Sequence, residues 1–168
     1  MLKDVTKFGI TSLNEYPSDR SSSNYYKQTI ENDILSIPYE NPDIKCIDSI
    51  SVHVDICDLK IIKTILGYKL IITAIKRYKI MYTANNDIKS VHTTGFESVF
   101  CEFILFESWL KDNKILNIKD VFIGIEDIII KSSDCRNIEI SLILIIIPII
   151  CFSNIPMSNN KKNDNLCK

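Results

Sequence analysis

Apolar and polar residues alternate along several long stretches of this chain, and this period of two residues restricts the fold more than any other feature. In residues 49–56 every even position is apolar and every odd position is polar. The even positions of residues 68–82 are also apolar or aromatic, except for Lys76, and we expect the strand to bend there. A period of two is typical of β-strands that bury one face and leave the other in solvent.

Further stretches rich in β-branched and aromatic residues predict more strands. Within residues 98–106, Cys101 alternates with Val99 and Phe103, so we expect Cys101 to be a small core residue. The remaining strand candidates are residues 25–38, 121–131 and 137–147. Residues 106–114 are the one candidate for a short helix. The pattern predicts an all-β fold, a single-domain β-sandwich of antiparallel strands with at most one short helix.

Length and charge limit the domain organisation and the partners. A chain of 168 residues suits one domain. Its 20 Lys and Arg balance 21 Asp and Glu, and no basic tract is present, so we expect no nucleic-acid partner. We divide the chain into a loose N-terminal segment at residues 1–24, a β domain at 25–156 and a polar flexible tail at 157–168.

The most apolar run covers residues 140–152. It has 13 residues and contains Pro148, whereas a membrane-spanning helix needs about 20 residues. We therefore expect a buried strand here and no transmembrane segment. The first twenty residues lack the apolar stretch of a secretory signal peptide, so we expect synthesis in the cytoplasm without export.

The candidate catalytic residues do not form a recognisable set. Ser90 and His92 are two residues apart, so in an extended segment they share a face and can form a hydrogen bond. Nucleophilic catalysis also needs an orienting group and an oxyanion hole, which the sequence does not indicate. Glu97 and Glu102 are five residues apart and fall on opposite faces of one strand. We expect no enzyme activity, no metal and no cofactor.

The six cysteines contain no C-x-x-C pair, which argues against a zinc or thioredoxin-like site. Four of them fall in expected turns, strand ends or the tail, namely Cys46, Cys57, Cys135 and Cys167. These four are candidates for intermolecular disulfides if the protein meets an oxidising environment. Unpaired thiols without a role remain the alternative.

Residues 79–104 contain K-I-M-Y, then S-V-H after a loop, then an aromatic residue and F-C-E-F-I. This arrangement resembles the central signature of the SPOCS domain, which is known from spore coat and spore-envelope morphogenetic proteins of clostridia. The candidate interaction or structural residues that match it are Tyr82, Ser90, Val91, His92, Phe96, Phe100 and Phe103. The chain departs from the pattern at Val99, where the family usually has proline. The likeness extends over residues 25–145.

The resemblance implies a non-enzymatic, structural and protein-binding role in the coat or envelope of bacterial endospores. The implied partners are other coat or morphogenetic proteins, or a second copy of this chain. The implied location is the mother-cell cytoplasm during synthesis and the spore surface afterwards. No counterpart of the family's LysM module is visible after Ile155, so binding to the basement-layer ATPase of the coat does not carry over. A carbohydrate- or small-ligand-binding β-sandwich of the spore envelope is the alternative.

Overall fold

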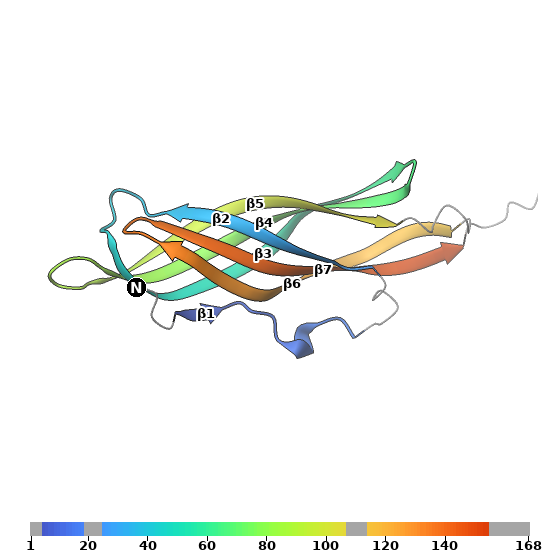
Figure 1. Ribbon diagram of the computed structural model, residues 1–168. Helices are drawn as coiled ribbons and strands as arrows, with labels where there is room; N and C mark the ends of the chain where they lie inside the picture. The colour runs from blue at the N-terminus through green and yellow to red at the C-terminus, as the bar shows by residue number, and fades with distance from the viewer. Residues whose placement is uncertain (1–4, 19–24, 107–113, 155–168) are drawn as a thin grey trace, which may run out of the picture.

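The computed structural model describes residues 5–18, 25–106 and 114–154 of the chain. Most of these residues lie in long β-strands that run along the length of the molecule (Figure 1). The elements are β1 (Thr6–Phe8), the 3-10 turn η1 (Leu13–Glu15), β2 (Lys27–Ser36), β3 (Ile44–Thr64), β4 (Gly67–Ala84), β5 (Val91–Phe106), β6 (Lys114–Ser133) and β7 (Asn137–Asn154). The predicted all-β class is confirmed.

The strands form two sheets that pack face to face. One sheet has the order β1-β3-β4-β5, and the other has the order β2-β7-β6. All pairs are antiparallel except β1 with β3, which is parallel and corrects the expectation of antiparallel strands alone. The β3–β4 and β6–β7 hairpins pair over more residues than the other strand pairs do. Each has three register shifts, which lie on β3 and on β6.

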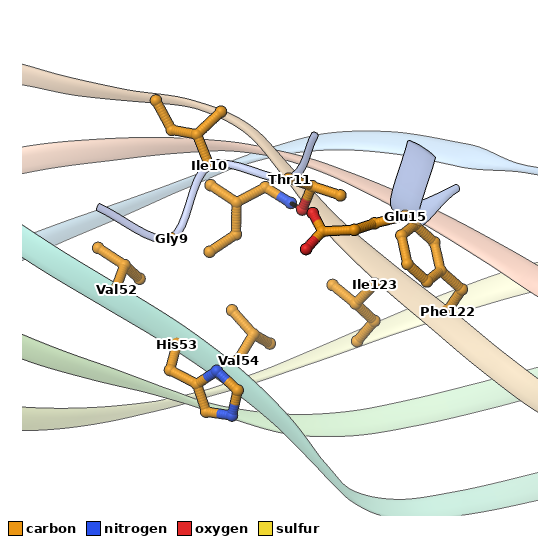
Figure 2. Close-up of a pocket in the computed structure, with 10 residues that line it drawn as sticks. Gly9, Ile10, Thr11, Glu15, Val52, His53, Val54, Phe122 and Ile123 are labelled. Carbon is orange, nitrogen blue, oxygen red and sulfur yellow. Dashed lines mark hydrogen bonds between the residues drawn. The ribbon is translucent and has the colours of Figure 1, made fainter. Parts of the chain in front are cut away.

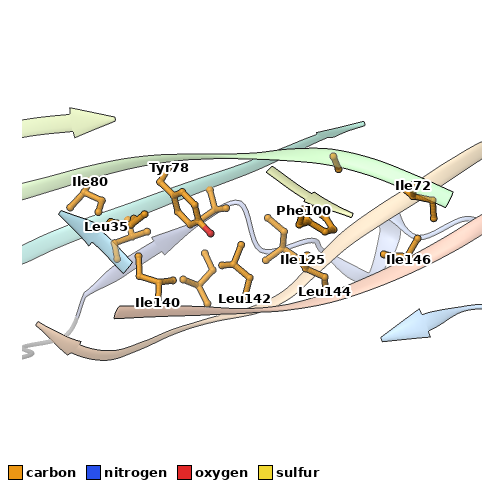
Figure 3. Packing of buried hydrophobic residues seen from close by; sticks show 14 of the residues in the cluster. Leu35, Ile72, Tyr78, Ile80, Phe100, Ile125, Ile140, Leu142, Leu144 and Ile146 are labelled. Carbon is orange, nitrogen blue, oxygen red and sulfur yellow. The ribbon is translucent and has the colours of Figure 1, made fainter. Parts of the chain in front are cut away.

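The core lies between the sheets and is built from the alternating positions of each strand. Figure 3 shows Ile72, Tyr78 and Ile80 of β4 facing Ile140, Leu142 and Leu144 of β7. These side chains are almost fully buried. Burial of apolar surface at roughly 25 cal/mol per Å² is the main force that holds two such sheets together. The face of β4 predicted to be buried is therefore the buried one.

The apolar run at residues 140–152 lies within β7, the central strand of its sheet. Its pairing with β2 ends at Ile146, so Pro148 sits where β7 pairs with β6 alone. A proline is tolerated at such a position because a ladder hydrogen bond is missing on that side. In the described part of the chain, no helix is long and apolar enough to cross a membrane.

The expected inward face of β5 is wrong. Phe100, Ile104 and Phe106 point into the core, whereas Val99, Cys101 and Phe103 are exposed on the outer face of the sheet. Both faces of this stretch are apolar, and the inward side was decided by pairing with β4. Cys101 is therefore a surface thiol and not a small core residue.

The N-terminal segment was expected to be loose, but residues 5–18 are docked on the sandwich. β1 pairs with β3, and Thr11 exchanges two hydrogen bonds with Ile125 of β6, each 2.8 Å long. The segment thus links the β3 edge of one sheet to the β6 edge of the other (Figure 1). We call residues 5–16 the N-terminal arm.

Gly9 fixes the path of this arm. Its φ is +98°, and a Cβ atom at this position would lie 2.0 Å from the carbonyl oxygen of Val52. Only glycine allows both the backbone angle and the close approach.

Two expectations concern residues that the structure does not describe. The short helix expected at residues 106–114 lies almost entirely outside the described residues, and the tail at 157–168 lies wholly outside them.

Candidate functional site

Three residues of the SPOCS-like signature meet at the loop end of the β4–β5 hairpin. Tyr82 lies opposite His92 in the ladder, and the two rings stack with centroids 5.7 Å apart. Ser90 Oγ lies 2.8 Å from His92 Nε2, so the predicted hydrogen bond between these side chains is present. The loop is closed by Asn86, whose side-chain amide donates to Ser90 Oγ and accepts from Ser90 N. We call these four residues the signature cluster.

The signature cluster is anchored to the rest of the sandwich through Tyr82. The Tyr82 hydroxyl donates to the carbonyl oxygen of Pro42 over 3.1 Å, and the side chain is fully buried. This burial raises the pKa of Tyr82 above its ordinary value. The phenol therefore remains a neutral donor at physiological pH, and it holds the loop after β2 against β4.

Arg136 joins the β6–β7 hairpin to the loop between β2 and β3, at the same end of the molecule. Its guanidinium lies 2.7 Å from Asp43 and donates to the carbonyl oxygens of Pro38 and Asn41. The same group lies 5.3 Å from the ring centroid of Tyr39. A planar guanidinium with several donors suits this role, because it can bind several acceptors of a loop at once. The result is a braced surface next to the signature cluster.

The signature cluster has the geometry of a structural network. His92 makes a hydrogen bond with the Ser90 hydroxyl and a ring contact with Tyr82. A Ser–His pair acts as a nucleophile only when a third group orients the imidazole and donors stabilise the oxyanion. No group of three or more His, Cys, Asp or Glu side chains in the described residues is placed to hold a metal ion.

The other signature residues do not join this cluster. Val91 is exposed at the start of β5, while Phe96 packs at the margin of the core and Phe100 lies inside it. Phe103 is exposed on the outer face, with Lys27 Nζ 4.7 Å and Lys69 Nζ 4.3 Å from its ring centroid. The signature therefore contains one compact cluster, two core residues and two separate surface residues.

A charged network between the sheets was not predicted from the sequence. Lys76 is only 1% exposed, and its Nζ lies 2.6 Å from Asp33 Oδ2 and 3.1 Å from Glu31 Oε2. Tyr78 donates to Asp33 Oδ2 over 2.5 Å, and Ser98 donates to Asp33 Oδ1 over 2.6 Å. A buried ammonium is tolerated only when it is paired in this way. We call these five residues the inter-sheet network.

The inter-sheet network sets the charge states of its members. Burial alone would raise the pKa of Asp33, but hydrogen bonds from Lys76, Ser98 and Tyr78 outweigh it and hold that pKa below its ordinary value. Burial and the Asp33 carboxylate both raise the pKa of Tyr78 strongly. Asp33 is thus ionised and Tyr78 neutral across the physiological pH range.

A second inter-sheet contact lies further along β2 and β5. Lys27 forms an ion pair with Glu102, and Thr29 Oγ1 donates to Glu102 Oε1 over 2.7 Å. Burial would raise the pKa of Glu102, but these two partners lower it below its ordinary value. Glu97 lies on the other face of β5 and pairs with Arg77, as expected from the odd spacing of the two glutamates.

A groove lies between the N-terminal arm, β3 and β6. Its volume is about 520 Å³, and its walls include Ile10, Val54, Phe122 and Ile123 (Figure 2). His53 lies at its margin, where its Nε2 is 2.9 Å from Asp55, and the ring is largely exposed. The groove thus combines apolar walls with polar side chains from Thr11, Glu15 and His53, a mixture that can orient a small ligand.

The candidate disulfide cysteines of the described residues are free thiols. Cys57 is exposed at a register shift of β3, Cys135 is exposed in the turn between β6 and β7, and Cys46 is half-buried near the start of β3. Cys167 lies outside the described residues. Cys101 is likewise a free thiol. The exposed thiols are accessible to a neighbouring molecule, and Cys101 joins them.

These features define a two-sheet, all-β protein whose sandwich is locked by polar contacts between the sheets and by braced loops at one end. No family model, curated protein or solved structure matches this chain.

Proposed function

We propose that this chain is a non-enzymatic, protein-binding component of the bacterial endospore coat or envelope, acting as a coat subunit or an assembly adaptor. The observation that supports the proposal is the signature cluster. The residues that resemble the SPOCS signature most specifically, Tyr82, Ser90 and His92, are joined to one another and support the loops at one end of the sandwich.

A partner-binding role fits the surface around this cluster. Val91, Ile88 and Tyr39 are exposed large side chains on the strands and loops at this end. Exposed aromatic and aliphatic side chains on a braced scaffold are typical of protein interfaces, because little conformational freedom is lost on binding. The proposed partners are other coat or morphogenetic proteins or a second copy of the chain. Synthesis in the mother cell would precede deposition on the spore.

The test is a pull-down from sporulating cells of the source bacterium combined with fractionation of purified spores. We expect the wild-type chain in the coat fraction, together with coat proteins. His92→Ala should lose this association, whereas His53→Ala is the matched control because His53 is the other histidine and lies on an exposed strand face. Absence of the wild-type chain from spores, or a hydrolase activity abolished by His92→Ala, would contradict the proposal.

A ligand-binding sandwich of the spore envelope is the second candidate, and the groove beside the N-terminal arm favours it. Calorimetric titration with soluble peptidoglycan fragments tests this role. Binding that is weakened by His53→Ala and unaffected by His92→Ala would favour the second candidate over the first.

A further inference from the structure

The turn between β3 and β4 exposes two large aliphatic side chains. Ile65 is 95% exposed and Leu66 is 61% exposed. Thr64 pairs with Gly67, so these two residues form the whole turn. Two-residue hairpin turns usually carry Asn, Asp or Gly, which suit both water and positive φ. Here Gly67, with φ +132°, supplies the unusual backbone angle, while the turn itself is apolar.

The turn lies at one extremity of the molecule (Figure 1). In the described residues, the pairing of β4 with β5 ends at Tyr68 and Phe106. β5 thus flanks β4 as far as Tyr68, and only residues 64–67 of the hairpin extend beyond it. Leu59 and Ile61 of β3 are each 40% exposed and extend the apolar surface from the tip toward the core.

Lysines surround this apolar tip on both faces of the hairpin. Lys69 lies opposite Ile62, and Lys60 lies opposite Ile71, so these two lysines are diagonal neighbours on the outer face. Lys63 lies opposite Tyr68 and points to the other face. Lys60 and Lys63 are exposed, and Lys69 is half-buried. We call residues 59–69 the lysine-flanked tip.

The geometry points to a surface of anionic phospholipid as the ligand of the lysine-flanked tip. Ile65 and Leu66 would enter the boundary between headgroups and acyl chains. The lysines would keep their ammonium groups at the level of the lipid phosphates, with their aliphatic stems along the apolar surface. Each lysine near an anionic leaflet adds attraction that falls off within a Debye length. This inference does not depend on the proposed function.

A lipid surface fits the tip better than a protein groove does. A specific protein interface typically covers about 800 Å² on each partner, and a tip of two turn residues presents far less. Lysines on opposite faces of the β3–β4 hairpin also match a continuous lipid surface, because its negative charge can reach both faces of the tip at once. An acidic groove on a single protein would have to enclose the tip to reach both faces.

The test is sedimentation of the purified full chain with vesicles of phosphatidylcholine, with or without phosphatidylserine. We expect binding to the vesicles that contain phosphatidylserine, and salt should weaken it. The double variant Ile65→Ser/Leu66→Ser should bind at least about tenfold more weakly, because two apolar side chains no longer enter the membrane. The triple variant Lys60→Gln/Lys63→Gln/Lys69→Gln should lose the preference for phosphatidylserine.

The matched control is Ile34→Ser, which removes a 69% exposed isoleucine on β2, a strand of the other sheet. Ile34→Ser should bind vesicles as the wild type does. Far-UV circular dichroism and the thermal midpoint should be unchanged in all variants because the altered side chains are exposed or half-buried.

Three outcomes would overturn the inference. One is equal sedimentation of the wild type and the Ile65→Ser/Leu66→Ser variant. Another is equal binding to vesicles with and without phosphatidylserine. The third is a wild-type chain that does not bind vesicles but self-associates through the tip. Light scattering would show this as an oligomeric wild type and a monomeric Ile65→Ser/Leu66→Ser variant. That result would assign the tip to a protein contact.

Discussion

Lys76 Nζ lies 2.6 Å from Asp33 Oδ2 in the interior of the sandwich, and this pair joins β4 of one sheet to β2 of the other. The two residues are 43 positions apart in the sequence. Glu31 shares the same ammonium, and Tyr78 and Ser98 complete the hydrogen bonds of the carboxylate. The position of β2 over the other sheet is therefore specified by charge as well as by apolar packing.

Lys76→Met should destabilise the fold, because it leaves the half-buried carboxylates of Asp33 and Glu31 without their cation. We expect a loss of about 3–5 kcal/mol in the free energy of unfolding, measured by urea denaturation. The matched control is Arg77→Met at the next position, whose ion pairs with Asp55 and Glu97 are exposed. Its cost should stay within about 1 kcal/mol. Equal losses in the two variants would contradict the structural role of Lys76.

Stability should fall in acid because Asp33 and Glu102 have folded-state pKa values below those of the unfolded chain. A lowered pKa stabilises the fold above the unfolded-state pKa, and this contribution is lost as pH falls through the folded-state pKa. Denaturant titrations from pH 7 down into the acid range should show the decline. In Asp33→Asn the remaining pH dependence should be shallower. A wild-type stability that is flat from neutral pH to below pH 4 is incompatible with this account.

Leu144→Asp should unfold the domain, because Leu144 is fully buried in β7 between β2 and β6. An unpaired charge at such a position costs several kcal/mol, a large part of the stability of a domain. Val99→Asp is the control, since Val99 is 64% exposed on β5. Circular dichroism and size-exclusion chromatography report the outcome. A folded Leu144→Asp protein that leaves a membrane fraction would show that the apolar run is an anchor.

Oxidation of the purified protein should give a ladder of disulfide-linked oligomers that reductant reverses. Cys57, Cys101 and Cys135 are exposed, and β5, which carries Cys101, is an edge strand of its sheet. Edge strands favour pairing between copies, and such pairing brings thiols close enough to react. Cys101→Ser and Cys135→Ser should each shorten the ladder on non-reducing gels, and Cys46→Ser should change it least. A monomer in light scattering with every thiol still titratable would defeat this prediction.

The sequence predicted the strands well where one face is polar. In β4 the alternation of residues 68–82 identified the buried face, and the turn after Ser133 fell where expected. In β5 the sequence could not decide, because Phe100 and Ile104 on one face compete with Val99 and Phe103 on the other. Only the pairing partner selects the inward side in such a strand.

The inter-sheet network shows a second limit. A lysine in an apolar series suggests an interruption of the buried face, yet Lys76 is itself buried, and β4 passes through it with unbroken pairing to β5. The signal was present in β2, where Glu31 and Asp33 alternate with exposed Ile30 and Ile34. An acidic series facing inward needs a cation on the opposite sheet, but the sequence does not say which strand lies opposite.

The two-point attachment of the N-terminal arm has a consequence for the order of folding during synthesis. Thr11 leaves the ribosome early, but its partner Ile125 is 114 residues further along the chain. The arm can therefore bind β6 only after nearly the whole sandwich has been made. Until then the arm can be held only by the pairing of β1 with β3. If that single attachment opens, the edge of β3 is available to other chains, and exposed edges promote aggregation of nascent proteins. Crowded polysomes translating this protein would be at greatest risk in the interval before Ile125 emerges.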